Sequence, residues 1–245
     1  MDAIASVRED DRAVGRKKRK GLEAASKRAP AALPRTRRSG QHEAPRREPA
    51  RGNAREQPDE GTRDRMVAGA ARLLAERGLQ ATSFSEVLEL TASPRGSVYH
   101  HFPDGKDQLV KAALDRVTAQ MGQFFSPKEG APPEKITDLF LSIWRGVLLR
   151  SQFRAGCAVV AVTVAADSRE LLEHTAGIFR AWRGRLAELL VSGGLAPGDA
   201  ARFAATLIAA SEGAVVLSRA EQSIEPFDLV AAELLDHVRS LARKD

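Results

Sequence analysis

The sequence predicts an all-α protein. Over residues 62–245, apolar side chains recur every three or four positions, which is the spacing of an amphipathic helix. The periodic stretches are separated by short breaks, such as Gly193-Gly194 and the Pro/Gly-rich segment 126–133. One run, 158–165, is rich enough in β-branched residues to resemble a buried strand. Because helical stretches flank it and a lone strand would have no partner, we expect a short buried helix there.

The first predicted helix begins at Thr62 and ends at Gly78. A threonine is a favourable N-cap, and a glycine commonly follows the last turn of a helix. The apolar positions between these two residues share one face: Met66, Val67, Ala70, Leu73 and Leu74.

Two short helices joined by a tight turn are predicted over residues 82–102. Thr82 or Ser83 is expected to cap the first helix, and Ser93 the second. Pro94 would then occupy the first helical position, where its missing N–H costs nothing. The inward side of the first helix would carry Val87, Leu88 and Leu90.

This pair has the pattern of a helix-turn-helix, whose second helix enters the major groove of DNA. The first turn of that helix would present Arg95, Gly96 and Ser97. The guanidinium group of Arg95 can donate two bonds to a guanine edge, which makes it the candidate for reading bases. Ser97 would contact a base or a phosphate, and Gly96 would let the backbone approach the DNA. The motif therefore predicts a DNA-binding regulator.

Residues 93–109 resemble a known family, the TetR family of bacterial transcriptional repressors, and the resemblance extends over about residues 62–121. The family's Tyr-x-x-Phe signature is present at Tyr99 and Phe102, followed by a lysine that opens the next helix. Lys106 comes four residues after Phe102, through a Pro-Asp-Gly insert, where most of the family has three. Together with the Pro-Arg-Gly-Ser start, this spacing resembles the subgroup that contains the lincomycin-resistance and flavonoid-responsive repressors.

The turn between the two short helices departs from the family pattern. Ala92 stands where the family usually has glycine. If this position needs a positive φ, alanine there costs about 1 kcal/mol or less.

The resemblance implies a three-helix helix-turn-helix domain over residues 62–121, then a helical effector-binding and dimerisation domain over 122–245. A homodimer would bind a palindromic operator in double-stranded DNA, and a small molecule would release it by shifting the fourth helix. The start of the first motif helix would face a phosphate with its free N–H groups. The resemblance implies further phosphate contacts at the end of the recognition helix and at the start of the fourth helix. The alternative for each residue is a solvated surface position, or for Tyr99 a packed core ring. The predicted DNA-contacting set is Thr82, Ser83, Ser93, Pro94, Arg95, Gly96, Ser97, Tyr99, His100 and Lys106.

Six helices follow the motif. The fourth helix begins near Lys106 and carries Val110, Ala113, Leu114, Val117 and Met121 on one face. Beyond the segment 126–133 and apart from the short run 158–165, the pattern predicts helices over residues 134–150, 169–192, about 197–220 and about 226–243.

An effector pocket is expected between the helices over residues 134–150 and 169–192, which contain both tryptophans of the chain. The alternative is that this apolar stripe is plain core. Charged groups near it are few, so an apolar or aromatic effector is expected. The expected lining is Phe140, Trp144, Val147, Leu148, Cys157, Ile178, Phe179 and Trp182.

The last two helices are where we expect self-association. Small residues on the helix over 197–220 would let a neighbouring helix approach closely, and two copies of the pair would form a four-helix bundle. The alternative is that these faces pack on their own domain. The expected interface is Ala205, Ala209, Gly213, Val216, Leu234 and Val238.

The net charge of +6 lies entirely in the first quarter of the chain. Residues 1–61 contain 16 Lys/Arg and 10 Asp/Glu, whereas residues 62–245 contain 22 of each sign. This segment has few apolar residues, so it is expected to be disordered. A mobile basic arm would attract DNA phosphates, and an architectural protein that coats DNA through this arm is the alternative function. A solubilising tail or a start codon assigned too early are the other interpretations.

Other classes of protein are disfavoured by the sequence. We find no nucleophile elbow, phosphate loop or cofactor fingerprint, so no enzyme and no cofactor are expected. His100 and His101 are adjacent on a helix and cannot easily share a metal ion. Cys157 has apolar neighbours and is expected to be a buried structural thiol. No stretch approaches the length of a membrane helix and no secretory signal is visible, so we expect a cytoplasmic, nucleoid-associated protein without a membrane.

Overall fold

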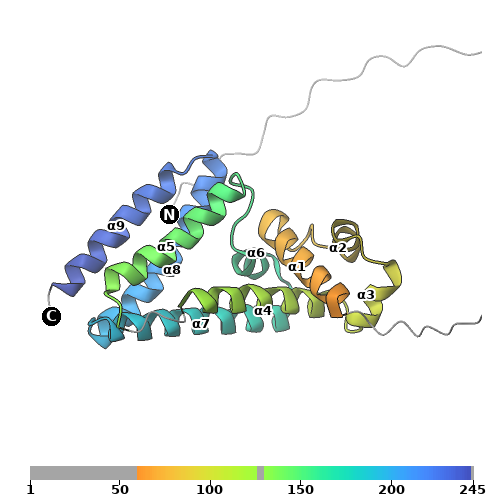
Figure 1. The fold of residues 1–245 in the computed structure, drawn as a ribbon, viewed down its shortest axis with the longest axis horizontal. Helices are drawn as coiled ribbons and strands as arrows, with labels where there is room; N and C mark the ends of the chain where they lie inside the picture. The colour runs from red at the N-terminus through yellow and green to blue at the C-terminus, as the bar shows by residue number, and fades with distance from the viewer. Residues whose placement is uncertain (1–59, 126–129, 244–245) are drawn as a thin grey trace, which may run out of the picture. The chain divides into compact units, whose positions relative to one another are not determined.

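The computed structural model describes residues 60–125 and 130–243, and every regular element in these two ranges is an α-helix (Figure 1). The prediction of an all-α protein is confirmed. The predicted basic tail, residues 1–61, lies outside the described residues except for its last two positions. The helices are α1 (Glu60–Arg77), α2 (Phe84–Thr91), α3 (Arg95–His101), α4 (Lys106–Phe125), α5 (Pro133–Arg150), α6 (Ala158–Ala165), α7 (Arg169–Ser192), α8 (Pro197–Glu221) and α9 (Glu225–Ala242).

Helix α1 is the support for the two motif helices, since it contacts α2, α3 and α4. Met66 and Leu74 on α1 are fully buried, as the helical spacing predicted. Helix α2 crosses close to α1 at Gly69, where a Cβ would lie 2.5 Å from Cγ2 of Thr91. The absence of a side chain at position 69 therefore sets how closely α2 can pack.

Two expectations for these helices are wrong. Thr62 is buried inside α1, which begins at Glu60, so it does not cap that helix. Leu90 on α2 is 41% exposed, because the helix turns its Val87 and Leu88 face toward the core instead.

The turn between α2 and α3 is built by backbone geometry and by one cap. Ser83 caps α2 as predicted: its hydroxyl accepts a bond from the amide of Glu86. Ala92 has φ 49° and ψ 35°, which confirms that this position needs the left-handed region. Ser93 does not cap α3. Pro94 holds the N-cap position, and the Ser93 hydroxyl accepts a bond of 2.8 Å from Thr91 instead.

The C-terminal helices pack around α8, which lies against α5, α7 and α9. Residues 158–165 form helix α6, so the expectation of a helix rather than a strand is confirmed. Helix α6 contacts α1, α4 and α7, which places it between the helix-turn-helix and the later helices. The observed bounds of α7, residues 169–192, are those that the sequence predicted.

One described helix, α8, is long and apolar enough by composition to cross a membrane, with a mean hydropathy of 1.4 over its most apolar window. This corrects the expectation that no stretch approaches such a length. About half of that window, 44%, is buried within the structure, where α8 packs between α7 and α9 as a core helix does.

Candidate DNA interface and ligand cleft

The first part of the candidate site is the exposed face of α3. Arg95, Gly96, Tyr99 and His100 are all exposed, and Tyr99 keeps 71% of its surface accessible. The Tyr99 ring meets the Phe84 ring of α2 edge-to-face, with centroids 5.9 Å apart. This contact fixes the direction of the tyrosine without burying it, so the packed-core alternative for Tyr99 does not hold.

The inner face of α3 explains why its outer face is presented rigidly. Val98 and Phe102 are almost fully buried and belong to the same core cluster as the buried residues of α1. The guanidinium carbon of Arg63, on α1, lies 5.6 Å from the centre of the Phe102 ring. Arg63 is an exposed cation beside α3 that the sequence interpretation missed, because nothing in its local pattern separates it from an ordinary surface arginine.

Lys106 ties the start of α4 to the turn that follows α1. Its Nζ donates a 2.7 Å hydrogen bond to the carbonyl oxygen of Leu79, and the side chain is half-buried. An ammonium group has three N–H donors, so this bond leaves two of them for another acceptor. The structure thus shows a structural role for Lys106, and its predicted phosphate contact stays a prediction.

Three hydroxyl groups of the predicted DNA-contacting set are already engaged within the protein. Thr82 is buried, and its hydroxyl donates to the carbonyl oxygen of Gly78 at 2.8 Å. Ser93 is buried as well, beside Thr91. Ser97 donates to the carbonyl oxygen of Pro94 at 2.6 Å. The expectation that the side chains of Thr82 and Ser93 face DNA is therefore wrong, since both build the turn. Ser83, the α2 cap, and the exposed Pro94 remain at the surface.

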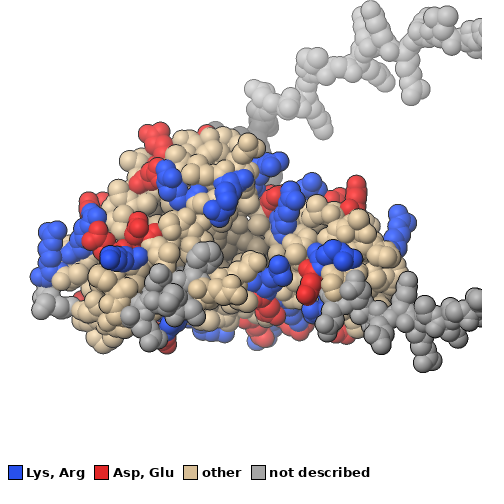
Figure 2. Space-filling view, viewed as in Figure 1, with Lys and Arg blue, Asp and Glu red and all other residues tan. Residues whose placement is uncertain are grey.

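The second part of the candidate site is a cleft of about 650 Å³ between the helix-turn-helix and the later helices. Figure 2 shows this face hollowed near its centre, with Lys and Arg side chains bordering the hollow. The cleft is formed by α1, α4, α5 and the start of α6. Its lining is Ala68, Ala71, Arg72, Ala75, Arg116, Val117, Gln120, Met121, Ser142, Ile143, Trp144, Val147, Arg150, Gly156, Cys157 and Ala158.

Only part of the expected pocket lines this cleft. Trp144, Val147 and Cys157 do so. The other five expected residues do not line it. Four are buried in the hydrophobic core, namely Phe140, Leu148, Ile178 and Trp182, and Phe179 is partly buried against that core. On α7 the rings of Phe179 and Trp182 pack edge-to-face at 5.8 Å. The sequence pattern identified buried faces, and tertiary packing decides which of them border a cavity.

The expectation that few charged groups surround the pocket is wrong for this cleft. Arg72, Arg116 and Arg150 line it, and no Asp or Glu does. Arg72 is paired with Glu76 at 2.9 Å. Arg116 and Arg150 are exposed and form no ion pair with any residue in the described ranges. These arginines come from three different helices, so the sequence could not show that they meet.

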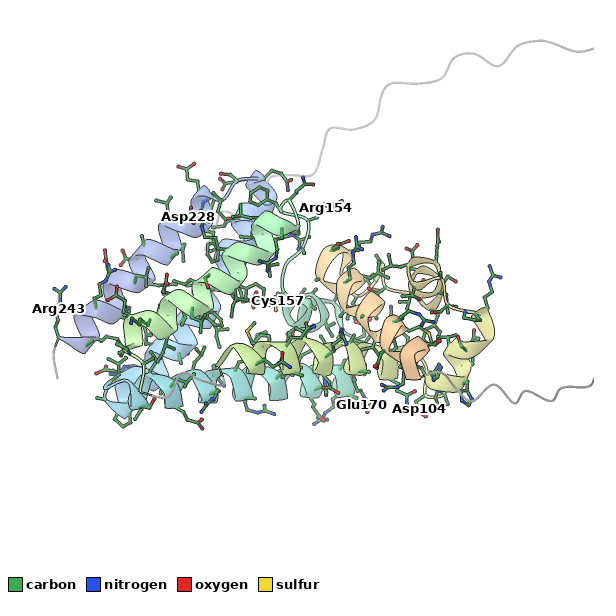
Figure 3. All side chains as sticks on the ribbon, in the orientation of Figure 1. Asp104, Arg154, Cys157, Glu170, Asp228 and Arg243 are labelled. Atoms are coloured by element: carbon green, nitrogen blue, oxygen red, sulfur yellow. The ribbon has the colours of Figure 1, made fainter. Side chains whose placement is uncertain are left out.

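Behind the cleft lies a buried pair of ionisable groups. Cys157, labelled in Figure 3 at the start of α6, is 7% exposed and in contact with the carboxyl group of Glu212 on α8. Burial raises the pKa of Glu212 to about 7, although the thiol hydrogen bond opposes this. Burial and the neighbouring carboxylate raise the pKa of Cys157 well above its ordinary value. The expectation of a buried Cys157 is confirmed, and a thiol in this state is a poor nucleophile.

The predicted self-association face divides into an exposed part and a buried part. Ala209, Gly213 and Val216 are exposed on α8, and Ala205 is half-buried. Leu234 and Val238 are buried in their own chain, where α9 packs on α5 and α8. Including those two in an interface is therefore wrong. The large exposed apolar residues of α8 and α9 that the prediction omitted are Leu217 and Leu229.

Two family profiles match the chain. Residues 66–113 match the family described as bacterial regulatory proteins, tetR family. Residues 133–233 match the transcriptional regulator LmrA/YxaF-like C-terminal domain. Both matches bear out the resemblance drawn from residues 93–109, including its subgroup.

Relatives that match most of this chain agree with these profiles. An HTH-type transcriptional regulator of Mycobacterium tuberculosis is 34% identical over 182 residues, which cover 71% of this chain and 93% of the relative. The HTH-type transcriptional regulator LmrA of Bacillus subtilis is 24% identical over 67% of this chain and 90% of its own. The solved structure of a regulatory protein TetR from Rhodobacter sphaeroides has a TM-score of 0.65 at 20% identity, over 72% of this chain and 98% of that one. That likeness supports the fold alone.

Proposed function

The chain belongs to the TetR family of bacterial transcriptional regulators, and from that premise we propose that it is a ligand-responsive repressor. The family and the relatives are DNA-binding regulators and not enzymes. In this proposal a homodimer binds a palindromic operator in the cytoplasm, and a small molecule in the cleft releases the DNA.

The observation that carries the proposal is the division of α3 into a buried and an exposed side. Val98 anchors the helix, while Arg95, Gly96, Tyr99 and His100 face solvent together. Arg95 forms no hydrogen bond or ion pair with any described residue, so its five N–H donors are available. A rigid helix with a free guanidinium group at its first turn suits direct readout of a guanine edge.

The exposed stripe of α8 suits the dimer contact. Ala209, Gly213, Val216 and Ala220 are all exposed, and their spacing of four, three and four residues places them on one side of the helix. Small residues let two helices approach closely. Leu229 of α9 is also strongly exposed. Exposed apolar side chains of this kind favour association.

The cleft suits an effector that acts on the DNA-binding helices directly. Four of its lining residues lie on α1, the support of α2 and α3, and four lie on α4. A ligand in this cleft would contact both helices and α5 at once. A ligand shifts the equilibrium between the DNA-binding and the DNA-releasing conformation only if its contacts differ between the two. A ligand that contacts α1, α4 and α5 can do so when these helices move relative to one another.

The test of this function is selection of genomic fragments by the full-length protein, followed by titration of the selected fragment. Arg95→Ala is expected to weaken specific binding by about 5- to 150-fold, the range for losing one good base contact. Arg180→Ala is the matched control, because Arg180 is an exposed arginine of α7 far from α3 in the sequence.

Two results would contradict the proposal. One is the absence of any common palindrome among the selected fragments. The other is equal binding of all fragments by wild type and Arg95→Ala, which would assign DNA binding to the basic residues 1–61 and favour the architectural alternative.

A further inference from the structure

The cleft combines an apolar interior with a purely cationic set of charges. Apolar side chains from all four segments line it, among them Val117, Met121, Ile143 and Val147. Its volume of about 650 Å³ falls within the range of sites that enclose a drug-sized molecule. The charged residues of the lining are all arginines, although residues 62–245 as a whole contain equal numbers of Lys/Arg and Asp/Glu.

Two of these arginines are available to a ligand. Glu76 neutralises Arg72 across one helical turn, whereas Arg116 and Arg150 have no carboxylate partner in the part of the chain that the structure describes. They come from α4 and α5, two of the helices that line the same cleft. A planar guanidinium group donates two parallel hydrogen bonds to a carboxylate, which makes arginine the preferred residue for recognising that group.

The position of Arg150 depends on the absence of a side chain one turn earlier. A Cβ at Gly146 would lie 2.6 Å from Nη1 of Arg150 and 3.2 Å from Cζ. The guanidinium group therefore lies folded back along the surface of α5, over the space that a side chain at position 146 would fill, and it remains in the lining of the cleft.

From these observations we infer that the effector is a small organic acid, with a carboxylate held by Arg116 and Arg150 and an apolar body enclosed by the cleft. This inference rests on the proposed function and specifies the chemical class of its effector. It replaces the purely apolar or aromatic effector that the sequence suggested. A neutral ligand of the same shape would leave the two guanidinium groups without a new partner, so it binds more weakly.

The direct test compares three molecules that share one apolar chain: decanoate, 1-decanol and decylamine. Binding to the full-length protein is followed by the fluorescence of its two tryptophans, one of which, Trp144, lines the cleft. Decanoate is expected to bind about tenfold or more tightly than 1-decanol, the factor expected for one charge-assisted contact, and decylamine to bind most weakly. The advantage of decanoate should shrink as salt is added.

Paired variants locate the effect. Arg116→Gln with Arg150→Gln is expected to weaken decanoate binding by about tenfold or more and to leave 1-decanol binding unchanged. The control is Arg180→Gln with Arg183→Gln, which removes two exposed arginines of α7 that do not line the cleft. It should bind decanoate as wild type does.

Three results would overturn the inference: no binding of decanoate, equal binding of decanoate and 1-decanol, or an unchanged decanoate affinity in the paired cleft variant. Each of these leaves the proposed function intact, because that function is judged by fragment selection without any ligand. Conversely, the absence of a specific DNA site would refute the repressor even if decanoate bound as expected.

Discussion

Arg219, in the last turn of α8, donates a hydrogen bond of 3.3 Å to the backbone carbonyl oxygen of Glu76, near the end of α1. The same Nη2 donates to the carbonyl oxygen of Arg154 at 2.9 Å. Beside it, the amide of Gly156 donates to the carbonyl oxygen of Ala75 at 2.9 Å. One guanidinium group thus fastens the helix that supports the DNA-binding motif to the helix proposed for dimerisation.

Replacing Arg219 with methionine tests this connection. Arg219→Met keeps much of the side chain's length but removes both bonds to the carbonyl groups, so the free energy of unfolding should fall by about 1–2 kcal/mol. Urea unfolding measures the loss. Arg180→Met is the control, since Arg180 is exposed and forms no ion pair or hydrogen bond among the described residues. An equal effect of the two substitutions would contradict the role assigned to Arg219.

The raised pKa of Glu212 predicts a specific dependence of stability on pH. Between about pH 4.5 and pH 7 the folded protein holds a proton on Glu212 that the unfolded chain releases. The free energy of unfolding should therefore fall as pH rises through this window, by at most about 3 kcal/mol for this one group. Glu212→Gln removes the titrating group.

The measurement is urea unfolding of both proteins at several pH values between about 5 and 8, a window chosen to lie below the titration of ordinary thiols. The Glu212→Gln protein should lose the fall in stability that Glu212 causes and be more stable than wild type at the upper end. Identical pH profiles for the two proteins would show that Glu212 is not protonated in the folded state.

Replacing Ala92 with glycine should stabilise the turn between α2 and α3. Its φ of 49° lies in the left-handed region, where alanine has a steric penalty and glycine has none. Ala92→Gly should raise the free energy of unfolding by several tenths to about 1 kcal/mol. Ala119→Gly, the same change at an exposed interior position of α4, should lower it by about 1 kcal/mol. A loss of stability in Ala92→Gly would contradict the backbone geometry of this turn.

Replacing Gly146 with alanine should raise stability and weaken ligand binding. Gly146 lies within α5, one turn before its last residue, and alanine there should stabilise the helix by about 0.5–1 kcal/mol. The new Cβ would displace the guanidinium group of Arg150, so the affinity for decanoate should fall by a few-fold to about tenfold while the affinity for 1-decanol stays constant. Thermal unfolding and tryptophan fluorescence measure the two quantities. An unchanged decanoate affinity would mean that Arg150 does not hold the carboxylate.

The local sequence was sufficient to predict most of the helices. Their limits are set by residues close in the chain, such as Ser83 at the start of α2 and Gly78 after α1, so a short window contains the necessary information. The exposed position of Arg95 could also be predicted, because it depends on one helix and its periodicity.

The cleft could not be predicted in the same way. Arg72, Arg116 and Arg150 come together only when α1, α4 and α5 pack, and an arginine on a helix surface gives no local signal of its distant neighbours. The pattern of α9 showed that Leu234 and Val238 share an apolar face, but an apolar face that contacts its own chain has the same pattern as one that contacts a second copy. Tertiary contacts decided both cases.

The bond between Lys106 and Leu79 has a consequence for how fast the protein can engage DNA. A free lysine side chain samples many rotamers, and immobilising it costs up to about 2 kcal/mol of conformational entropy. Here that ordering takes place during folding, since Nζ is already held at the edge of the proposed DNA interface. With two N–H donors still available, an approaching phosphate would meet a cation that needs no rearrangement, so the encounter would be limited by diffusion and orientation.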